Sequence, residues 1–549
     1  MILMKLFRSV KNAVILGAVV LPLFSCGTTA KHESAPRPDL AVTQLAPVVR
    51  SADRPSEGVY YCIFVRSFAD SNGDGVGDFN GIVSKLDYLN DGNDLTTDDL
   101  GVTGIWLLPI YPSQSYHGYD VDDYYATNPD YGTIDDFQRL VHECKKRGIS
   151  VILDMTCNHS SVYNQWFIDS RDPGDPHRTW YRWISADDSR YSLFQQIWGH
   201  KVWNEYKGYY YAGLFGSNMP DFNLDDPALR QEFKNVMKFW LDKGVAGFRY
   251  DAASHVYNSA KTPAGSNSVE QGVAWWKEIT AYDRSVRPDA FTVGEVWEPT
   301  STRAQYLAGL GSDFHFDMGT KIVDEIRSEN AGNNSFANGL QGEYARYAES
   351  DPEYVDAPFL SNHDQNRIAG LLRGKVPQLK LAAAMYMFAE GVPFVYYGEE
   401  IGMMGAKPDE QLRTPMMWNK PGRDRYQTTW ESSRYNKNTL TVAEQTKDPD
   451  SLLRFYRRII RIKTAHPALY RGRFKAVNTG NQFISSWAME CDTEKALVLH
   501  NLSPQTVTVQ LPAEYTLPVI FTTYPGTSVD SDGTLTIPPF CSVVAAGGK

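Results

Sequence analysis

The chain contains eight short apolar segments that alternate with longer amphipathic segments, and this repetition constrains the fold more than any other feature. Most of the short segments are apolar throughout, which is typical of strands buried on both faces of a parallel sheet. A strand followed by a helix eight times over predicts an α/β fold, a (β/α)8 TIM barrel. The predicted strands are Val59–Phe68, Gly104–Ile110, Ser150–Met155, Ala246–Asp251, Phe291–Val296, Asp313–Asp317, Ala357–Leu360 and Pro393–Tyr397.

The segments between these strands carry helix signals at both ends. Thr133 is a candidate N-cap, two aspartates follow it in the first turn, and a basic last turn precedes Gly148, which closes the helix. Apolar residues also recur at helical spacing in Pro227–Gly244 and in Ser451–Thr464. We expect these helices to surround the barrel.

Two parts of the chain depart from the strand–helix pattern. The segment at about 160–219 is rich in Trp and Tyr, lacks a helical period and is too long for an ordinary connection. It predicts a small domain B, inserted after the third strand and overhanging the barrel mouth. From residue 467 the chain shows short alternating strands such as Ala496–Leu502 and Thr506–Leu511. We therefore expect a barrel at 58–466 and a C-terminal antiparallel β-sandwich domain at 467–549.

The N-terminus resembles an export signal. Three basic residues precede an apolar run at 13–24, which is too short for an ordinary transmembrane helix. The following sequence, Leu23-Phe24-Ser25-Cys26-Gly27, resembles a bacterial lipoprotein box. Residues 1–25 are thus a predicted signal peptide, Cys26 the lipidation site and 26–57 a flexible tether. We expect export and lipid anchoring to a bacterial membrane, at the outer membrane, cell surface or periplasmic face. The alternative is an ordinary cleaved signal in which Cys26 is incidental.

Composition narrows the class of ligand. The net charge is -11, which argues against a nucleic acid partner because phosphate contacts require clustered Lys and Arg. Aromatic residues make up 13% of the chain, and their flat rings suit the apolar faces of sugars. We expect a neutral ligand and a monomer, although the sequence does not report oligomeric state. Cys491 and Cys541 could pair, but spacing cannot establish a disulfide.

Carboxylates stand at the ends of three predicted strands. Asp251 ends the fourth strand, Glu295 lies near the end of the fifth, and Asp364 follows the seventh. In a (β/α)8 barrel the functional groups come from the carboxyl ends of the strands and the loops that follow. We therefore expect these three acids to converge on one rim. They are accompanied there by His159, Arg249 and His363.

The segments that contain these residues resemble the four signature regions of the α-amylase family, glycoside hydrolase family 13. A further segment, Met219-Pro220-Asp221-Phe222-Asn223, resembles the fifth region of that family. The resemblance covers about residues 57–549, and the segments are specific for the family when they occur together and in this order. The four signature segments are Asp154-Met155-Thr156-Cys157-Asn158-His159, Gly247-Phe248-Arg249-Tyr250-Asp251-Ala252-Ala253-Ser254-His255, Gly294-Glu295-Val296-Trp297 and Ser361-Asn362-His363-Asp364.

The resemblance implies catalytic roles for the three acids. Asp251 would be the nucleophile that forms a glycosyl-enzyme ester, with Arg249 keeping it ionised. Glu295 would be the general acid/base, and Asp364 would bind the 2- and 3-hydroxyls of the sugar. Retaining chemistry requires nucleophile and acid carboxyls about 5–5.5 Å apart, so we expect the α-anomer as first product. A barrel that kept its shape and lost activity is the alternative, but such a relative should lack at least one of these acids.

The resemblance also implies residues that bind substrate. His159 and His363 would donate to sugar hydroxyls. In the segment His117-Gly118-Tyr119-Asp120, Tyr119 would stack on the reactive sugar, the alternative being a Tyr packed under a loop. In relatives that trim chain ends, an Asp like Asp120 and an Arg like Arg413 clamp the terminal glucose. Both are present, so exo-action remains open.

The segment Asp70-Ser71-Asn72-Gly73-Asp74-Gly75-Val76-Gly77-Asp78 is typical of a calcium loop. It places oxygen atoms at alternate positions, with Gly75 at the turn. Gly81 stands where an EF-hand has its bidentate Glu, so the loop is not an EF-hand. It resembles a calcium loop found after the first strand in part of the family, and a metal-free Asp/Gly turn is the alternative. A second calcium between Asn158 and the insertion is a further option with incomplete ligands. The ligands predicted for the structural Ca²⁺ are Asp70, Asn72, Asp74, the Val76 carbonyl and Asp78.

Residues near the nucleophile bear on bond specificity. Ala252 and His255 resemble members that act on α-1,4 bonds, whereas relatives specialised for α-1,6 bonds typically carry Val in place of that Ala. Ser254 stands where many α-amylases have a Lys on the leaving-group side, which leaves acceptor binding open. We expect an endo-acting α-amylase on starch or maltooligosaccharides. The alternatives are an α-glucosidase, oligo-1,6-glucosidase or transglycosylase of the same family, and a non-catalytic starch-binding surface lipoprotein.

Overall fold

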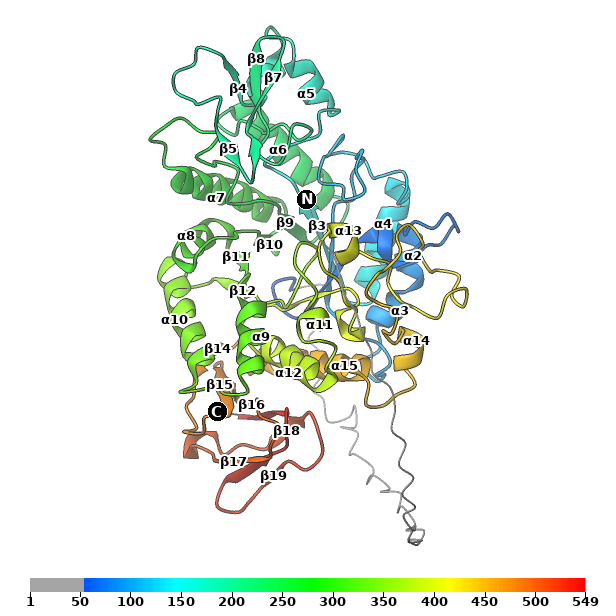
Figure 1. The fold of residues 1–549 in the computed structure, drawn as a ribbon, viewed down its shortest axis with the longest axis vertical. Helices are drawn as coiled ribbons and strands as arrows, with labels where there is room; N and C mark the ends of the chain where they lie inside the picture. The colour runs from blue at the N-terminus through cyan, green and yellow to red at the C-terminus, as the bar shows by residue number, and fades with distance from the viewer. Residues whose placement is uncertain (1–53, 549) are drawn as a thin grey trace, which may run out of the picture. The chain divides into compact units, whose positions relative to one another are not determined.

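The barrel predicted from the sequence is present in the computed structural model, which describes residues 54–548. The predicted signal peptide, Cys26 and most of the predicted tether lie outside the described residues. Eight parallel strands form one sheet in the order β12-β11-β10-β9-β3-β2-β1-β13 (Figure 1). Phe359, just beyond β12, makes an isolated parallel bridge to Phe394 in β13, so the barrel is nearly closed. The strands are β1 (Tyr60–Ile63), β2 (Gly104–Leu107), β3 (Ser150–Met155), β9 (Gly247–Tyr250), β10 (Phe291–Gly294), β11 (Ser312–Phe314), β12 (Val355–Ala357) and β13 (Phe394–Tyr396).

Four predicted strands run three or more residues past the observed ends, and the second and sixth end at Leu107 and Phe314. The first ends at Ile63, and Val65–Phe68 forms a helical turn, α1. A short apolar run does not reveal by its periodicity whether it is a buried strand or a buried helical turn. The seventh strand, β12, lies mostly before the predicted Ala357–Leu360. Pro358 follows β12 directly and has no N–H to donate to a neighbouring strand, which explains why regular pairing stops there.

Aromatic rings fill the interior of the barrel. The ring of Trp106 in β2 lies 5.2 Å from that of Phe314 in β11 and 6.1 Å from that of Phe394 in β13. Gly104 makes room for Tyr60 on the neighbouring strand, since a Cβ at Gly104 would come within 2.4 Å of the tyrosine ring. The interior is therefore a packed core, and a ligand site must lie at the rim.

The predicted helix signals are confirmed. Helix α4 has Thr133 as its N-cap, in a capping box with Asp136, and Gly148 follows its end with a φ of 74°. No helix of residues 54–548 is long and apolar enough to cross a membrane. The helices that accompany the barrel are α1, α2 (Phe79–Ser84), α3 (Leu86–Leu89), α4 (Ile134–Lys146), α6 (Pro227–Leu241), α7 (Ser268–Val286), α8 (Thr300–Leu310), α9 (Met318–Ser328), α10 (Ser335–Ser350), α11 (Ile368–Leu371), α12 (Val376–Met387), η4 (Glu399–Ile401), α13 (Asp409–Leu412), α14 (Val442–Gln445), α15 (Leu452–Ala465) and α16 (Pro467–Arg471).

The inserted segment after β3 has a sheet of its own. Its strands pair antiparallel in the order β4-β8-β7, and a separate two-stranded hairpin joins β5 to β6 (Figure 1). Contrary to the expectation of no helical period, two short helices precede the sheet; at about six residues each, they are too short to give a periodic signal. The elements are α5 (Gln165–Ser170), η3 (Pro176–Trp180), β4 (Trp183–Ser185), β5 (Gln196–Ile197), β6 (His200–Lys201), β7 (Trp203–Tyr206) and β8 (Tyr209–Ala212).

The C-terminal part is an antiparallel domain of two sheets, as predicted. A five-stranded sheet in the order β14-β15-β16-β21-β18 and a three-stranded sheet in the order β17-β20-β19 share one apolar core. Leu497 and Val543 come from the first sheet, and Val509 and Leu535 from the second. The elements are β14 (Arg473–Ala476), β15 (Ile484–Glu490), β16 (Glu494–Asn501), β17 (Val507–Gln510), η5 (Ala513–Tyr515), β18 (Val519–Thr522), β19 (Ser528–Val529), β20 (Thr534–Ile537) and β21 (Ser542–Gly548).

The cysteines of the described residues are free thiols. Cys62, Cys144 and Cys157 are buried. Cys491 and Cys541 do not form the disulfide that spacing left open. The Cys541 sulfur instead lies 3.3 Å from the hydroxyl of Thr522.

Candidate active site

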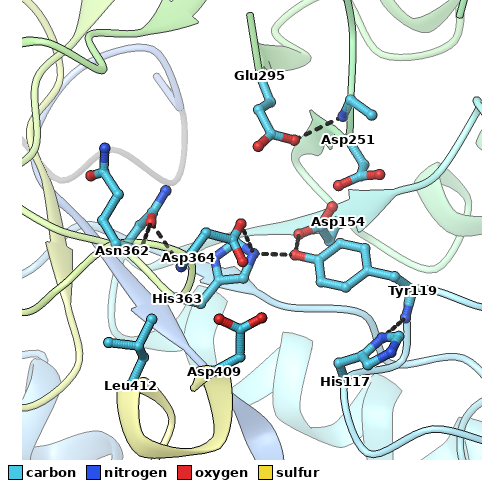
Figure 2. Close-up of polar contacts among 12 residues, drawn as sticks. His117, Tyr119, Asp154, Asp251, Glu295, Asn362, His363, Asp364, Asp409 and Leu412 are labelled. Carbon is cyan, nitrogen blue, oxygen red and sulfur yellow. Dashed lines mark hydrogen bonds and ion pairs between the residues drawn. The ribbon is translucent and has the colours of Figure 1, made fainter. Parts of the chain in front are cut away.

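Three acids from the carboxyl ends of barrel strands line one cavity of about 630 Å³. Asp251 follows β9 directly, Glu295 follows β10 directly, and Asp364 lies in the loop after β12. The backbone pairing of β9 with β10 brings the first two together, because Tyr250 lies opposite Gly294. The convergence expected from the sequence is therefore present, and Figure 2 shows all three side chains around the same space.

Arg249 connects three carboxylates at the carboxyl ends of neighbouring strands. Its side chain is only 1% exposed, and its Nη1 lies 2.6 Å from Asp154 Oδ1 and 2.8 Å from Asp251 Oδ1. Its Nη2 lies 2.7 Å from Glu295 Oε2. A buried guanidinium is stable only when its charge is paired with acidic groups. Because its N–H donors lie in one rigid plane, it also holds the carboxylates that bind it at fixed positions relative to one another. The two arms of Arg249 thus fix Asp251 and Glu295 beside each other.

The charges of the site depend on these pairings. Burial raises the pKa of Asp251 well above its usual range, and the positive charge of Arg249 acts against this rise. Burial also acts to raise the pKa of Asp364, but His363 and then Arg413 outweigh it and hold that pKa far below the usual range. Asp364 is therefore a firmly ionised acceptor, whereas the charge of Asp251 depends on its arginine.

A chain of polar contacts runs from Tyr119 through His363 to Asp364 (Figure 2), and Arg413 extends it. The Tyr119 hydroxyl lies 2.6 Å from His363 Nε2 and 3.1 Å from Asp154 Oδ2. His363 Nε2 also lies 3.0 Å from Asp364 Oδ2, and Arg413 Nη2 lies 2.9 Å from Asp364 Oδ1. Tyr119 lines the cavity, so the structure places its ring at the wall, as stacking on a sugar requires.

His159 and His255 also line the cavity. Burial lowers the pKa of His159 to about 3 and that of His255 to about 4, so both are neutral at neutral pH. Asn158 Nδ2 lies 3.1 Å from His159 Nδ1. A neutral imidazole offers one donor and one acceptor, which suits sugar hydroxyls.

Asp120 and Arg413, the two residues considered for a clamp on a chain end, have different polar partners. Arg413 and His117 line the cavity, but Asp120 is not among the residues that do. Asp120 is 3% exposed, and its carboxylate accepts hydrogen bonds from the hydroxyls of Ser113 and Ser115. Its nearest cationic candidate is His117, whose Nδ1 lies 3.9 Å from Asp120 Oδ1. Arg413 pairs with Asp364.

A lysine occupies the place considered for a second calcium. The Lys261 ammonium is fully buried, donates to Asn158 Oδ1 at 2.6 Å and lies 3.2 Å from Asp221 Oδ1. Burial lowers the pKa of Lys261 to about 8, and Asp221 opposes this shift. Asn158 follows β3, whereas Asp221 lies at the end of the insertion. A protein cation therefore links the inserted domain to the barrel, and we propose no second calcium there.

The predicted calcium loop is closed by hydrogen bonds to its own backbone. Asp70 Oδ1 accepts from the N–H of Asn72, Asn72 Oδ1 from that of Asp74, and Asp74 Oδ1 from that of Val76. These bonds curl alternate side chains over the loop. Asp78 accepts from Ser71 and from the N–H of Gly81, as the N-cap of α2. No three His, Cys, Asp or Glu side chains within residues 54–548 are grouped to bind a metal. The other two predicted ligands, the Asn72 side chain and the Val76 carbonyl, are not among these four residue types.

Several cavity residues were not identified from the sequence. Asp154, which pairs with Arg249 without lining the cavity, could also have been identified, because a carboxylate at the end of a buried strand needs a partner. Trp297, two residues after Glu295, carried a similar positional signal. Glu298 directly follows Trp297, and the others come from the insertion and from the loop after β13, where sequence position does not indicate proximity. The cavity residues not singled out are Trp198, Phe215, Met219, Trp297, Glu298, Lys407 and Asp409.

Comparisons with known proteins agree with this geometry. The family model described as the alpha amylase catalytic domain matches residues 62–472, and that of the alpha-amylase SusG C-terminal domain matches residues 484–544. Alpha-amylase 3 of Dictyoglomus thermophilum is 39% identical over 81% of this chain and 84% of its own length. The 4-alpha-glucanotransferase of Thermotoga maritima is 31% identical over 81% of this chain and 96% of its own. The crystal structure of an alpha-amylase from H. orenii superposes with a TM-score of 0.81 at 37% identity, covering 90% of this chain and all of that one.

Proposed function

This chain belongs to the α-amylase family of glycoside hydrolases, and from that premise we propose that it is an endo-acting enzyme that cleaves α-1,4-glucosidic bonds with retention. One observation carries the proposal. Asp251 and Glu295 are held by the two arms of Arg249 at the wall of one cavity. Two adjacent carboxyls of this kind suit a double displacement, in which one attacks the sugar and the other moves the proton.

In the proposed reaction Asp251 attacks the anomeric carbon while Glu295 gives its proton to the leaving oxygen. Tyr119 supports the sugar ring, and the firmly ionised Asp364 accepts its hydroxyls. His159 and His363 donate to the same sugar, most strongly as positive charge develops at the ring. Glu295 then takes a proton from water, which attacks the ester and releases the α-anomer.

Two features support α-1,4 bonds and attack within the chain. Ala252 and His255 are the residues expected beside the nucleophile of α-1,4-acting members. The carboxylate of Asp120 is bound by Ser113 and Ser115, and Arg413 pairs with Asp364, which favours attack within the chain over trimming of chain ends. A glucanotransferase is among the relatives, so products must decide between hydrolysis and transfer.

Early products from amylose test the proposal. We expect a mixture of maltooligosaccharides and a rapid fall in chain length, with the α-anomer seen first by NMR. Glucose as the main early product would indicate an α-glucosidase, and products longer than a maltotriose substrate would indicate transfer. Binding of starch without any release of reducing ends would indicate a non-catalytic binding protein. A β-anomer as first product would contradict retention.

We propose that the loop at residues 70–78 binds one structural Ca²⁺. The alternating Asx turns, the positive φ of Gly75 (92°) and the oxygen-rich side chains support this. The predicted ligands are those named above, and the ion would stabilise the loop without taking part in the reaction. Chelation should lower the melting temperature and added Ca²⁺ should restore it. An Asp74→Ala variant should lose this response, and an unchanged melting temperature in the parent would contradict the proposal.

We also propose that the enzyme is exported and anchored by a lipid on Cys26. The basic lead, the short apolar run and the Cys–Gly pair that follows support this. The full chain, expressed in a diderm bacterium, should appear in the membrane fraction and incorporate labelled palmitate. A Cys26→Ser variant should lose both properties. Recovery of the unlabelled parent in the medium would contradict the anchor.

A further inference from the structure

The strand that carries the proposed general acid stops pairing just before that residue. Strand β10 pairs with β11 through a single residue pair, Gly294 with Asp313. Glu295 and Val296 lie beyond the end of β10. The N–H of Val296 donates instead to the side chain of Asp313, 3.0 Å from its Oδ1. The residue directly after the general acid is therefore bound by a side chain of the neighbouring strand.

Arg303 in helix α8 fixes the carboxylate of Asp313. Its Nε lies 2.9 Å from Asp313 Oδ2, the oxygen that does not bind Val296, and both side chains are fully buried. Neither terminal nitrogen of Arg303 has a hydrogen-bond partner among residues 54–548, and the carboxylate of Asp356 lies 3.9 Å away. Asp313 is thus the closest partner of a buried cation, so its orientation is set before it binds Val296.

The ion pair also strengthens the bond to Val296. Burial raises the pKa of Asp313 to about 7, and the positive charge of Arg303 acts against this rise. The carboxylate form of Asp313 therefore depends on Arg303. A hydrogen bond to an ionised acceptor is roughly twice as strong as one to a neutral acceptor.

These contacts bear on catalysis through the backbone of Glu295. Before the carboxyl, the N–H of Glu295 donates to the Tyr250 carbonyl at 3.0 Å, which continues the pairing of β10 with β9. After it, the bond from Val296 to Asp313 takes over on the side of β11. A proton donor must lie within hydrogen-bond reach of the leaving oxygen, and a misplacement of about 1 Å can cost about 10²-fold in rate. Asp313 does not line the cavity, so any effect on the reaction must pass through Glu295.

We propose that Asp313 is a positioning residue for the general acid and that Arg303 supports it. This rests on the proposed function and adds two residues to it. As Asp251 bonds to the anomeric carbon, the bond from that carbon to the leaving oxygen breaks and this oxygen takes the proton of Glu295. Asp313 places Glu295 for this transfer. It therefore matters for a leaving group that needs a proton, and little for one that departs without it.

The test compares two substrates of the full chain that differ in the leaving group. Maltoheptaose loses a sugar whose oxygen must be protonated, whereas α-maltosyl fluoride loses fluoride, which needs little help from an acid. The readout is kcat/KM for each, because it reports the attack of Asp251 and excludes the later attack of water. Melting temperatures are measured alongside.

Four variants separate positioning from stability. Asp313→Ala removes the acceptor of the Val296 N–H, and Asp313→Asn keeps an oxygen there. The double variant Arg303→Met/Asp313→Ala removes the acceptor without leaving a buried cation unpaired. Asp99→Ala is the control, because Asp99 is paired with Arg461 in another buried ion pair and does not line the cavity.

We expect Asp313→Ala and the double variant to lose about 10²-fold in kcat/KM on maltoheptaose and to stay within about threefold of the parent on α-maltosyl fluoride. Asp313→Asn should recover part of the loss. Asp99→Ala should lower the melting temperature and leave the ratio of the two kcat/KM values unchanged.

Two results would overturn the positioning role. One is an equal loss on both substrates, which would indicate general damage to the fold. The other is an unchanged kcat/KM on maltoheptaose in the double variant. A parent that cleaves neither substrate would instead refute the proposed function.

Discussion

At the scale of single residues, Arg249 sets the electrostatics of the site because it binds the proposed nucleophile, Asp251, and the proposed general acid, Glu295, at once. Asp251 is buried, and burial raises its pKa, so the attacking carboxylate depends on this one cation for its charge. Asp364 differs, since His363 and Arg413 both stabilise its ionised form. The two aspartates should therefore respond differently to acid.

We expect Asp251→Asn to lower kcat by at least about 10³-fold, because an amide cannot form the glycosyl ester. The melting temperature and the affinity for maltooligosaccharides should change little. Initial rates on maltoheptaose and binding calorimetry measure the two effects. Glu298→Gln is the control, because Glu298 lines the same cavity without binding Arg249, and it should keep activity within about tenfold. Comparable losses in both variants would contradict the assignment of the nucleophile.

The raised pKa of Asp251 predicts the acid limit of activity. The reaction needs the carboxylate, so kcat/KM should fall as pH drops through that raised pKa, above the usual range for an aspartate. Lys in place of Arg249 cannot bind all three carboxylates, so Arg249→Lys should move the acid limb to higher pH and lower kcat about 10²-fold. The readout is kcat/KM from pH 4 to 8, with Arg287→Lys at an exposed ion pair as control. An acid limb that does not move would contradict this role.

At the scale of elements, the inserted domain is linked to the barrel by the buried ammonium of Lys261 between Asn158 and Asp221. Both acceptors are themselves buried, so removal of the cation would leave an aspartate without a counter-charge. The insertion carries Trp198 and Phe215 to the cavity wall. This link therefore affects the shape of the site as well as stability.

Lys261→Met should lower the free energy of unfolding by about 3–5 kcal/mol, because Asp221 stays buried and unpaired. Lys238→Met is the matched control, since Lys238 pairs with Asp242 at the surface and should change stability by less than about 1 kcal/mol. Urea denaturation followed by tryptophan fluorescence measures both. Equal stability of the two variants would show that the buried ammonium is not a structural link.

At the scale of the whole chain, the C-terminal sandwich packs against the barrel through Trp487. This side chain is fully buried, and its Nε1 donates to the Phe388 carbonyl at 3.0 Å. Asn334 donates to the carbonyls of Val477 and Ser486, which adds a second polar connection. Buried contacts of this kind should make the two parts unfold together.

Trp487→Ala should cost about 3–5 kcal/mol and split the calorimetric transition into two. Val529→Ala, at an exposed position of the outer sheet, is the control and should keep one transition. Differential scanning calorimetry distinguishes these outcomes. Two transitions already present in the parent would contradict the coupling.

The sequence alone determined the barrel, its strand order and the acids at its rim. Apolar runs and helix caps depend on neighbours within a few residues, and Asp251, Glu295 and Asp364 stand out because each follows such a run. Arg249 was identified by its position two residues before Asp251. The resemblance to a known family then supplied roles that spacing could not.

Only the tertiary structure decided which polar groups face the cavity and which are used elsewhere. Asp120 belongs to the segment His117-Gly118-Tyr119-Asp120 that resembles the family, yet its carboxylate accepts hydrogen bonds from the hydroxyls of Ser113 and Ser115 and does not line the cavity. Lys261 and Trp198 gave no local signal, because their partners Asp221 and His255 lie dozens of residues away in the chain. Such contacts arise when an inserted domain folds back over a barrel, and their energy depends on burial and pairing that no short stretch of sequence contains.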